Sequence, residues 1–221
     1  MHIATKALLG RSGWPKRFLS AAARRCGARV RVTGAPLQPH SLLVCNHISW
    51  LDIPVLGGAT GCAFVSKQEL GHPLVHWMAD QGATLYIRRE HRRGAHRQAL
   101  AIARRLAEPQ PLALFPEGTT GPGNSMLPFR STLFAAVAPP PPGVKVRPVA
   151  IDYGEAAPQI AWHQETGKDN VLRILGRARS TPVTVRLLDP LPPMDDRKEL
   201  AYAAREAIGD ALASSRASAA L

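Results

Sequence analysis

The sequence predicts an α/β fold, a single domain with a mainly parallel central sheet flanked by helices. Short apolar runs rich in strand-forming residues recur at 41–45, 62–66, 84–87, 112–115, 145–151 and 183–188. Helix-like stretches separate the earlier runs, and this alternation is typical of parallel sheets. A chain of 221 residues suits one domain of ordinary size with a sizeable core.

The chain opens with a basic amphipathic segment, which we expect over residues 1–31. Eight Lys or Arg residues and no Asp or Glu precede Asp52. Apolar residues recur among them at helical spacing: Trp14, Phe18, Leu19 and Ala22. Such a segment can lie in the interface of an anionic bilayer, or it can pack on the domain as a surface helix with a solvated basic face. The sequence alone leaves both interpretations open.

Two later helices complete the layers around the sheet. The stretch 91–106 predicts a helix that turns Leu100, Ile102 and Leu106 inward and most of its arginines outward. A last helix should begin near Asp196, which forms a capping box with Glu199, and should run through residue 212. Residues 214–221 are expected to fray, so the folded domain is predicted to span residues 32–213.

The charge balance calls for an anionic partner. Lys and Arg total 28 against 16 Asp and Glu, which gives a net charge of +12 at pH 7. Nucleic acid, phospholipid and a phosphorylated substrate would all satisfy this balance. Only 5% of residues are aromatic and no nucleic-acid signature is present, which argues against a nucleic-acid-binding module. A non-catalytic adaptor that binds anionic lipid is a further alternative.

Polar, chemically capable residues follow each of the first four predicted strands, at 46–52, 67–69, 88–89 and 116–121. The carboxyl ends of parallel strands lie along one edge of a sheet, which is where open α/β sheets bind ligands. We therefore expect residues about seventy positions apart to share one crevice.

The first of these segments carries His47 and Asp52. His47 follows a strand and Asp52 opens the next helix, where Pro54 suits the first turn. The Asp52 carboxylate can therefore accept a hydrogen bond from one ring nitrogen of His47. The second ring nitrogen then stays available as a general base for a substrate hydroxyl, because a histidine pKa of about 6.5 suits that task. Taken alone, this spacing more often marks a structural histidine. Cys45, just before the segment, is expected in the buried wall.

The fourth segment, FPEGTTG at 115–121, brings backbone N–H groups, hydroxyls and glycines to a strand end. Such a turn can cradle phosphate oxygens, with Lys67 and Arg88 supplying positive charge from neighbouring loops. Glu117 would repel a phosphate, so we expect it to accept a hydrogen bond from a substrate hydroxyl or to orient a cation. A bare Gly/Thr turn is more often an ordinary connection.

Together these segments resemble the glycerolipid acyltransferases of the PlsC type. The motifs, in the family's order and spacing, are NHISWLD at 46–52, SKQEL at 66–70, GATLYIRR at 82–89, FPEGT at 115–119 and VRPVAI at 146–151. The combination of NHxSxxD with FPEGT in one chain is highly specific. The resemblance implies that residues 32–213 form an acyltransferase domain, like that of 1-acyl-sn-glycerol-3-phosphate acyltransferase.

The resemblance also implies a role for each site residue. His47 would deprotonate the free hydroxyl of 1-acyl-sn-glycerol 3-phosphate (lysophosphatidate), and Asp52 would orient His47. The oxygen would attack the thioester of acyl-CoA or acyl-carrier protein, giving phosphatidic acid without an acyl-enzyme, a metal or a cofactor. The implied acceptor-binding residues are Lys67, Arg88, Glu117, Gly118 and Thr119.

One departure from the family pattern affects the acceptor. Thr120 stands where many relatives carry an arginine, and Arg130 is the residue that could replace that cation. FPEGTT followed by PFRS at 128–131 also resembles lyso-ornithine lipid acyltransferases, whose acceptor lacks a glycerol phosphate. Lyso-ornithine lipid or another lysolipid is therefore the alternative acceptor.

Cysteine usage and hydropathy bear on location. Cys26, Cys45 and Cys62 form no CxxC pair and leave an odd thiol, which suits a reducing compartment. The sequence lacks the run of about 18 apolar residues that a transmembrane helix needs, and it lacks a signal-peptide pattern. We expect a peripheral or monotopic protein at the cytoplasmic face of the inner (plasma) membrane, with an anionic membrane surface as partner.

Overall fold

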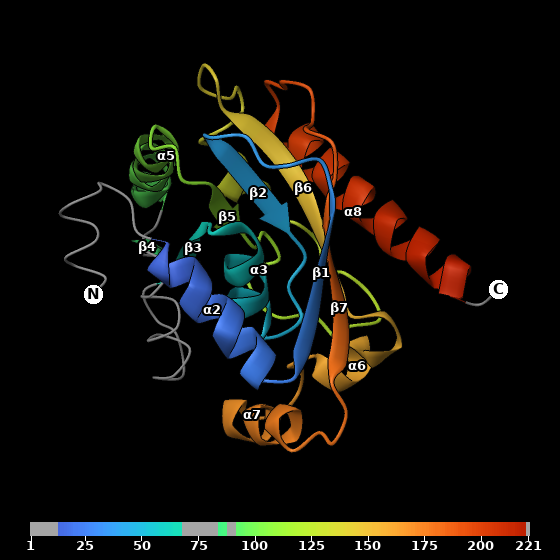
Figure 1. The fold of residues 1–221 in the computed structure, drawn as a ribbon. Coiled ribbons are helices and arrows are strands. Elements are labelled where there is room, and N and C mark those ends of the chain that lie inside the picture. The colour runs from blue at the N-terminus through green and yellow to red at the C-terminus, as the bar shows by residue number, and fades with distance from the viewer. Residues whose placement is uncertain (1–12, 68–83, 88–91, 220–221) are drawn as a thin grey trace.

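The structure, a computed structural model, describes residues 13–67, 84–87 and 92–219 (Figure 1). Within them one sheet runs in the order β1-β7-β6-β2-β5-β3-β4. The strands are β1 (Ala28–Gly34), β2 (Ser41–Cys45), β3 (Ala63–Lys67), β4 (Leu85–Ile87), β5 (Leu112–Leu114), β6 (Lys145–Asp152) and β7 (Thr181–Leu187). All neighbouring strands are parallel except β6 and β7, so the mainly parallel sheet is confirmed.

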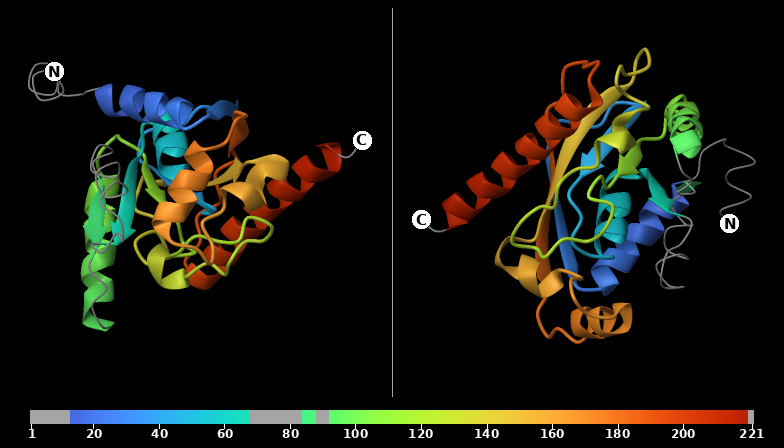
Figure 2. Two further views of the ribbon diagram at one scale, coloured as in Figure 1. Left: turned by 90° about the horizontal axis from the view of Figure 1, so that it is seen from below. Right: turned by 180° about the vertical axis from the view of Figure 1, so that it is seen from behind.

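Helices cover both faces of the sheet, as the views in Figures 1 and 2 show. The helices are α2 (Trp14–Arg25), α3 (Asp52–Thr60), α5 (Arg92–Leu106), α6 (Ala157–Ile160), α7 (Gly167–Leu175) and α8 (Arg197–Ala219). Short 3₁₀ turns, η1 (Ser131–Phe134) and η2 (Gly154–Ala156), lie in the connections. No helix in the described part of the chain is long and apolar enough to cross a bilayer.

The alternation of side chains along β2 explains why the sheet needs two helical layers. Leu43 and Cys45 pack in one apolar cluster with residues of α2 and α3. Leu42 and Val44 point to the other face and pack in a second cluster with residues of α5 and α8. Every residue of β2 is buried, which is expected for a central parallel strand covered on both sides. The buried position predicted for Cys45 is confirmed.

The basic segment near the N-terminus is partly built into the domain. Leu19 and Ala23 of α2 are buried. A side chain at Gly58 of α3 would lie 2.6 Å from the backbone of Ser20, so α2 and α3 approach closely enough to require glycine there. The described part of this segment therefore packs on the domain through one face of α2, and its association with a membrane stays a prediction. The sequence did not predict β1, and the expected boundary after residue 31 falls inside this strand.

Two expectations about helices were wrong in detail. Leu100 was expected to point inward, but it is 45% exposed on α5, whereas Ile102 and Leu106 are buried as expected. The last helix was expected to run through residue 212, with fraying from 214, but α8 continues to Ala219. Its start is as predicted, because the Asp196 carboxylate accepts the backbone N–H groups of Lys198 and Glu199.

Candidate active site

The carboxyl ends of β2, β5 and β6 bring three distant segments of the chain together. β2 pairs with β5 on one side and with β6 on the other, all in parallel. The segments that follow these strands carry His47, Glu117 and Tyr153. A backbone hydrogen bond joins the segments of His47 and Glu117 directly, because Gly121 donates its N–H to the carbonyl of His47 at 2.8 Å. The segments that were predicted to share one edge of the sheet are thus adjacent among the described residues.

His47 and Asp52 form the predicted pair. Nδ1 of His47 lies 2.8 Å from Oδ2 of Asp52. Since a carboxylate oxygen can only accept, Nδ1 is the donor, and the remaining ring nitrogen, Nε2, is the proton acceptor. The His47 side chain is 17% exposed, whereas that of Asp52 is fully buried. The pair is therefore oriented for a substrate that arrives on the histidine side.

Four hydrogen bonds compensate for burial of the Asp52 carboxylate. Besides His47, the backbone N–H groups of Ile48 and Ser49 donate to Oδ2, at 2.8 and 3.0 Å. The hydroxyl of Tyr153 donates to Oδ1 at 2.7 Å. Charge-assisted bonds of this kind are what a buried carboxylate needs to stay in place. The carboxylate is consequently fixed on both oxygens, and it fixes the histidine in turn.

Tyr153 is a site residue that the sequence reasoning missed. It is 2% exposed and lies just past the end of β6. Burial and the adjacent Asp52 carboxylate hold the pKa of the Tyr153 hydroxyl well above its usual value, so this group stays protonated and donates. The signal was present in the sequence, because a tyrosine follows the strand predicted at 145–151. Tyr153 therefore follows the fifth predicted strand, at the same edge of the sheet as the segments after the first four.

Glu117 holds the backbone of His47 by a hydrogen bond from its buried carboxylate. Its Oε1 accepts the backbone N–H of His47 at 2.7 Å, and its Oε2 accepts the backbone N–H of Leu127 at 2.8 Å. The residue is 3% exposed. Burial raises the pKa of Glu117, and the N–H groups of His47 and Leu127 oppose that rise. Both oxygens thus already have backbone partners, an arrangement that favours a positioning role over direct contact with a substrate hydroxyl.

Phe115 and Thr120 hold the same loop against its neighbours. The ring of Phe115 stacks on that of His47, with centroids 4.2 Å apart and planes inclined by 19°. The hydroxyl of Thr120 donates to the carbonyl of Trp162 at 2.6 Å, and Trp162 donates its own N–H to the carbonyl of Ile48 at 2.7 Å. The residue that replaces the family's arginine therefore serves to tie the loop to the segment before α7.

Gly118, Thr119 and Arg130 form the exposed side of the site. Gly118 has a φ of +73°, a conformation that glycine adopts without strain. A Cβ placed there would lie 2.9 Å from Nε of Arg130, so the arginine side chain covers this glycine. Thr119 and Arg130 are both exposed. Arg130 thus lies beside the FPEGT turn, and its role in binding the acceptor stays a prediction.

The two remaining predicted residues are less completely placed. Lys67 is the last residue of β3, two strands from β2 in the sheet, so its backbone reaches the same edge. Arg88 lies outside the described residues. Among the residues that the structure describes, no group of three His, Cys, Asp or Glu side chains is arranged to hold a metal ion.

Comparisons with known proteins identify similar sequences. The family model described as "Acyltransferase" matches residues 29–152. A lyso-ornithine lipid O-acyltransferase of Pseudomonas aeruginosa is 41% identical over 203 residues, covering 86% of this chain and 76% of that protein. A 1-acyl-sn-glycerol-3-phosphate acyltransferase of Neisseria meningitidis is 34% identical over 136 residues, covering 61% of this chain and 49% of that protein.

A solved structure shares the fold. The crystal structure of the 1-acyl-sn-glycerophosphate acyltransferase PlsC from Thermotoga maritima superposes with a TM-score of 0.65 at 23% sequence identity. The match covers 92% of this chain and 79% of that one. The arrangement of sheet and helices described above is therefore that of a known α/β architecture.

Proposed function

This chain belongs to the PlsC-type acyltransferase family, and on that premise we propose that it transfers a fatty acyl group from a thioester to the hydroxyl of a lysolipid. The observation that carries the proposal is the bond between His47 Nδ1 and the buried Asp52 carboxylate. It leaves Nε2 as a base at the exposed side of the pair. An alcohol of high pKa needs such a base at the moment it attacks a carbonyl.

The reaction follows from this geometry. Nε2 of His47 takes the proton of the acceptor hydroxyl while the oxygen bonds to the thioester carbonyl carbon. Asp52 stabilises the imidazolium that forms, and Tyr153 keeps Asp52 in place. The carbon–sulfur bond then breaks, and the imidazolium returns its proton to the departing thiolate. No serine or cysteine nucleophile is required, so the acyl group passes directly from donor to acceptor.

We propose lyso-ornithine lipid as the acceptor and lysophosphatidate as the second candidate. The relative from Pseudomonas aeruginosa supports the first choice. So does Thr120, which bonds to Trp162 and leaves Arg130 as the described cation beside the FPEGT turn. The ornithine headgroup carries a carboxylate, which a single guanidinium can bind in a bidentate manner. The relatives from Neisseria support lysophosphatidate.

An acceptor screen tests the proposal. Purified protein with one labelled acyl-CoA is given lyso-ornithine lipid, lysophosphatidate or glycerol 3-phosphate, and the labelled lipid product is measured. Faster turnover of lyso-ornithine lipid than of lysophosphatidate is expected, with none of glycerol 3-phosphate. The reverse order would replace the first acceptor by the second. If no acceptor is used with acyl-CoA, the screen is repeated with acyl-carrier protein, and failure with both donors would overturn the enzyme assignment.

A further inference from the structure

The helix α7 exposes two leucines at the end of the molecule where the active site lies. Leu172 is 58% exposed and Leu175 is 52% exposed, while Ile174 on the same helix is buried. Residues three apart on a helix point in nearly the same direction, so the two leucines form one apolar spot. Figures 1 and 2 show α6 and α7 beyond the carboxyl ends of β2 and β6.

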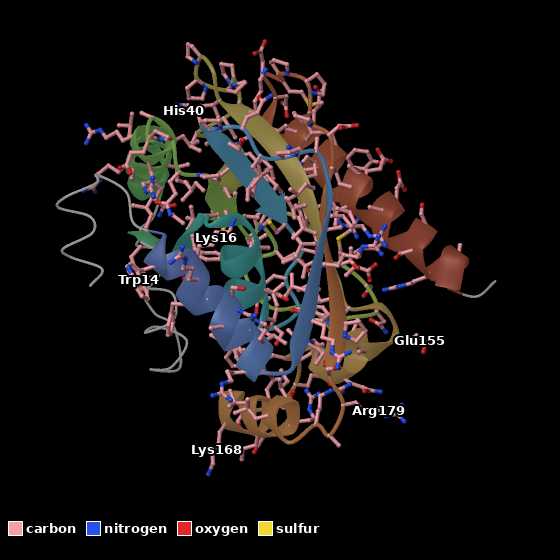
Figure 3. All side chains as sticks on the ribbon, in the orientation of Figure 1. Trp14, Lys16, His40, Glu155, Lys168 and Arg179 are labelled. Atoms are coloured by element: carbon pink, nitrogen blue, oxygen red, sulfur yellow. The ribbon has the colours of Figure 1, made fainter. Side chains whose placement is uncertain are left out.

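Exposed basic side chains lie on the same end of the molecule as this spot. Lys168 lies on α7 and Arg179 on the connection to β7, and both are exposed and point away from the molecule (Figure 3). The carbonyl of Gly27 accepts the N–H of Thr181, which brings the last turn of α2 beside this connection. That turn adds two further exposed cations, Arg24 and Arg25.

The acidic residues at this end do not cancel the positive charge. Glu165 is paired with Arg173, and this pair holds the Glu165 pKa below its usual value. Asp169 in the first turn of α7 bonds to Thr166, the N-cap residue. Glu155, on the η2 turn, is exposed. The basic groups around the leucines therefore outnumber the unpaired acidic ones.

Trp162 also joins α7 to the catalytic loop, which is the segment 46–51 between β2 and α3 that carries His47. The Trp162 backbone N–H donates to Ile48, next to His47, and its indole N–H donates to the carbonyl of Glu165 at 3.1 Å. The side-chain amide of Asn170, on α7, donates to the carbonyl of Ala161 at 3.1 Å. A surface that bound α7 would therefore lie close to His47.

We propose that α7 and the last turn of α2 form a docking surface for an anionic bilayer. Leu172 and Leu175 would enter the interface, and the surrounding Lys and Arg side chains would contact the lipid headgroups. This inference rests on the proposed function, since a lysolipid acceptor resides in a bilayer. It goes beyond that function by assigning the contact to described residues near His47 and by orienting the site toward the membrane.

The test is co-sedimentation of the purified protein with vesicles. Vesicles of phosphatidylcholine containing phosphatidylglycerol are compared with vesicles of phosphatidylcholine alone. The variant Leu172→Ser/Leu175→Ser is expected to bind the anionic vesicles about tenfold more weakly than the parent. The matched control is Leu100→Ser/Tyr202→Ser, which changes two other exposed apolar residues, on α5 and α8, and should bind as the parent does. Thermal unfolding checks that each variant folds.

A second variant tests the charges without touching the leucines. Lys168→Gln/Arg179→Gln is expected to bind anionic vesicles more weakly and to show a smaller loss of binding as salt rises. Equal vesicle binding by the parent, the leucine variant and the charge variant would overturn the proposal. So would an effect confined to turnover with an acyl-carrier-protein donor, because α7 would then contact that protein.

Vesicle binding does not depend on turnover, so this test and the acceptor screen can fail separately. Binding that the leucine variant loses, with no turnover of any acceptor, would support the docking surface and overturn the proposed function. Turnover by a protein whose leucine variant still binds vesicles fully would do the opposite. A lysolipid of short chain, used as free monomers in solution, should be turned over equally by the parent and the leucine variant.

Discussion

Oε1 of Glu117 accepts the backbone N–H of His47 at 2.7 Å, although 70 positions separate the two residues in the sequence. This bond sets where the catalytic loop leaves β2. The other oxygen of Glu117 holds Leu127, so one buried carboxylate fixes two loops at once. The glutamate of the FPEGT motif therefore links the loop that carries His47 to the loop that carries Leu127.

Replacing Glu117 separates a positioning role from substrate binding. Glu117→Ala leaves two backbone N–H groups without their acceptor, so we expect the free energy of unfolding to fall by about 2–4 kcal/mol. Glu117→Gln keeps one acceptor oxygen and should lower kcat about tenfold with a similar KM for the acceptor. Steady-state kinetics and thermal unfolding measure both effects. A raised KM with unchanged kcat and unchanged stability would instead favour direct contact with the substrate, as the sequence suggested.

Substitutions of the catalytic pair test the mechanism. His47→Ala removes the base and should lower kcat at least about a thousandfold. Asp52→Asn should lower kcat to a similar extent, because an amide can present its N–H₂ to Nδ1 and favour the wrong histidine tautomer. Circular dichroism provides the check on folding. Turnover within a few fold of the parent in His47→Ala would contradict the proposed base.

Tyr153→Phe probes the hydroxyl behind Asp52. Without the donor at Oδ1, the Asp52 carboxylate loses one of its four hydrogen bonds and holds the His47 ring less firmly. We therefore expect kcat to fall about tenfold while KM for both substrates changes little. Thermal unfolding reports any loss of stability, so a parent-like kcat in folded Tyr153→Phe protein would refute this role. Another phenol elsewhere, Tyr202→Phe, serves as the control.

Arg130 is expected to govern recognition of the acceptor. Arg130→Gln should raise KM about tenfold for a lysolipid whose headgroup carries a carboxylate or a phosphate, while changing kcat little, because the residue is exposed and touches no member of the catalytic pair. The matched control is Arg197→Gln, another exposed arginine at the start of α8. Kinetics over a range of acceptor concentrations separate the two parameters. A parent-like KM in Arg130→Gln would assign the headgroup to other residues.

The cysteines should differ in reactivity. Burial raises the pKa of Cys62 to about 12 and that of Cys45 well above its usual value. At pH 8 both are neutral thiols, which are poor nucleophiles. Burial also raises the pKa of Cys26, but this residue is only partly buried. Iodoacetamide should modify Cys26 first in the native protein and all three after unfolding, as read by mass spectrometry. Prompt native labelling of Cys45 would show instead that the strand opens readily.

Much of the architecture could be predicted because it depends on local patterns. The buried run at 41–45 coincides with β2, and the pairing of His47 with Asp52 follows from five positions of spacing at the start of a helix. β1 was harder to predict because it pairs along one side only, and only its first residue, Ala28, is buried. Its alternating basic residues therefore look like part of an amphipathic segment. The hydrogen bonds of Tyr153 to Asp52 and of Glu117 to His47 join segments that are far apart in the chain, so sequence spacing did not reveal these partners.

The exposure of Leu100 has a similar physical reason. Only part of the apolar face of α5 packs in the core, through Ile102 and Leu106, and Leu100 lies on the part that the sheet does not cover. Ile102 and Leu106 take the buried positions, and periodicity alone cannot tell which side of the stripe will be left uncovered. The extension of α8 to Ala219 reflects the same limit, because helix ends without strong capping residues are poorly defined by sequence.

The side chain of Asn46 acts as a substitute peptide group. Its amide accepts the N–H and donates to the C=O of Ile151 on β6, at 2.8 and 3.0 Å, just beyond the last backbone pairing of β2 with β6. The backbone N–H and C=O of Ile151 thereby keep hydrogen-bond partners at the point where the main chain of β2 has turned away. The turn toward His47 is thus released from the ladder without leaving an unpaired edge, and the sheet can stay rigid while the chain beside it is shaped for chemistry.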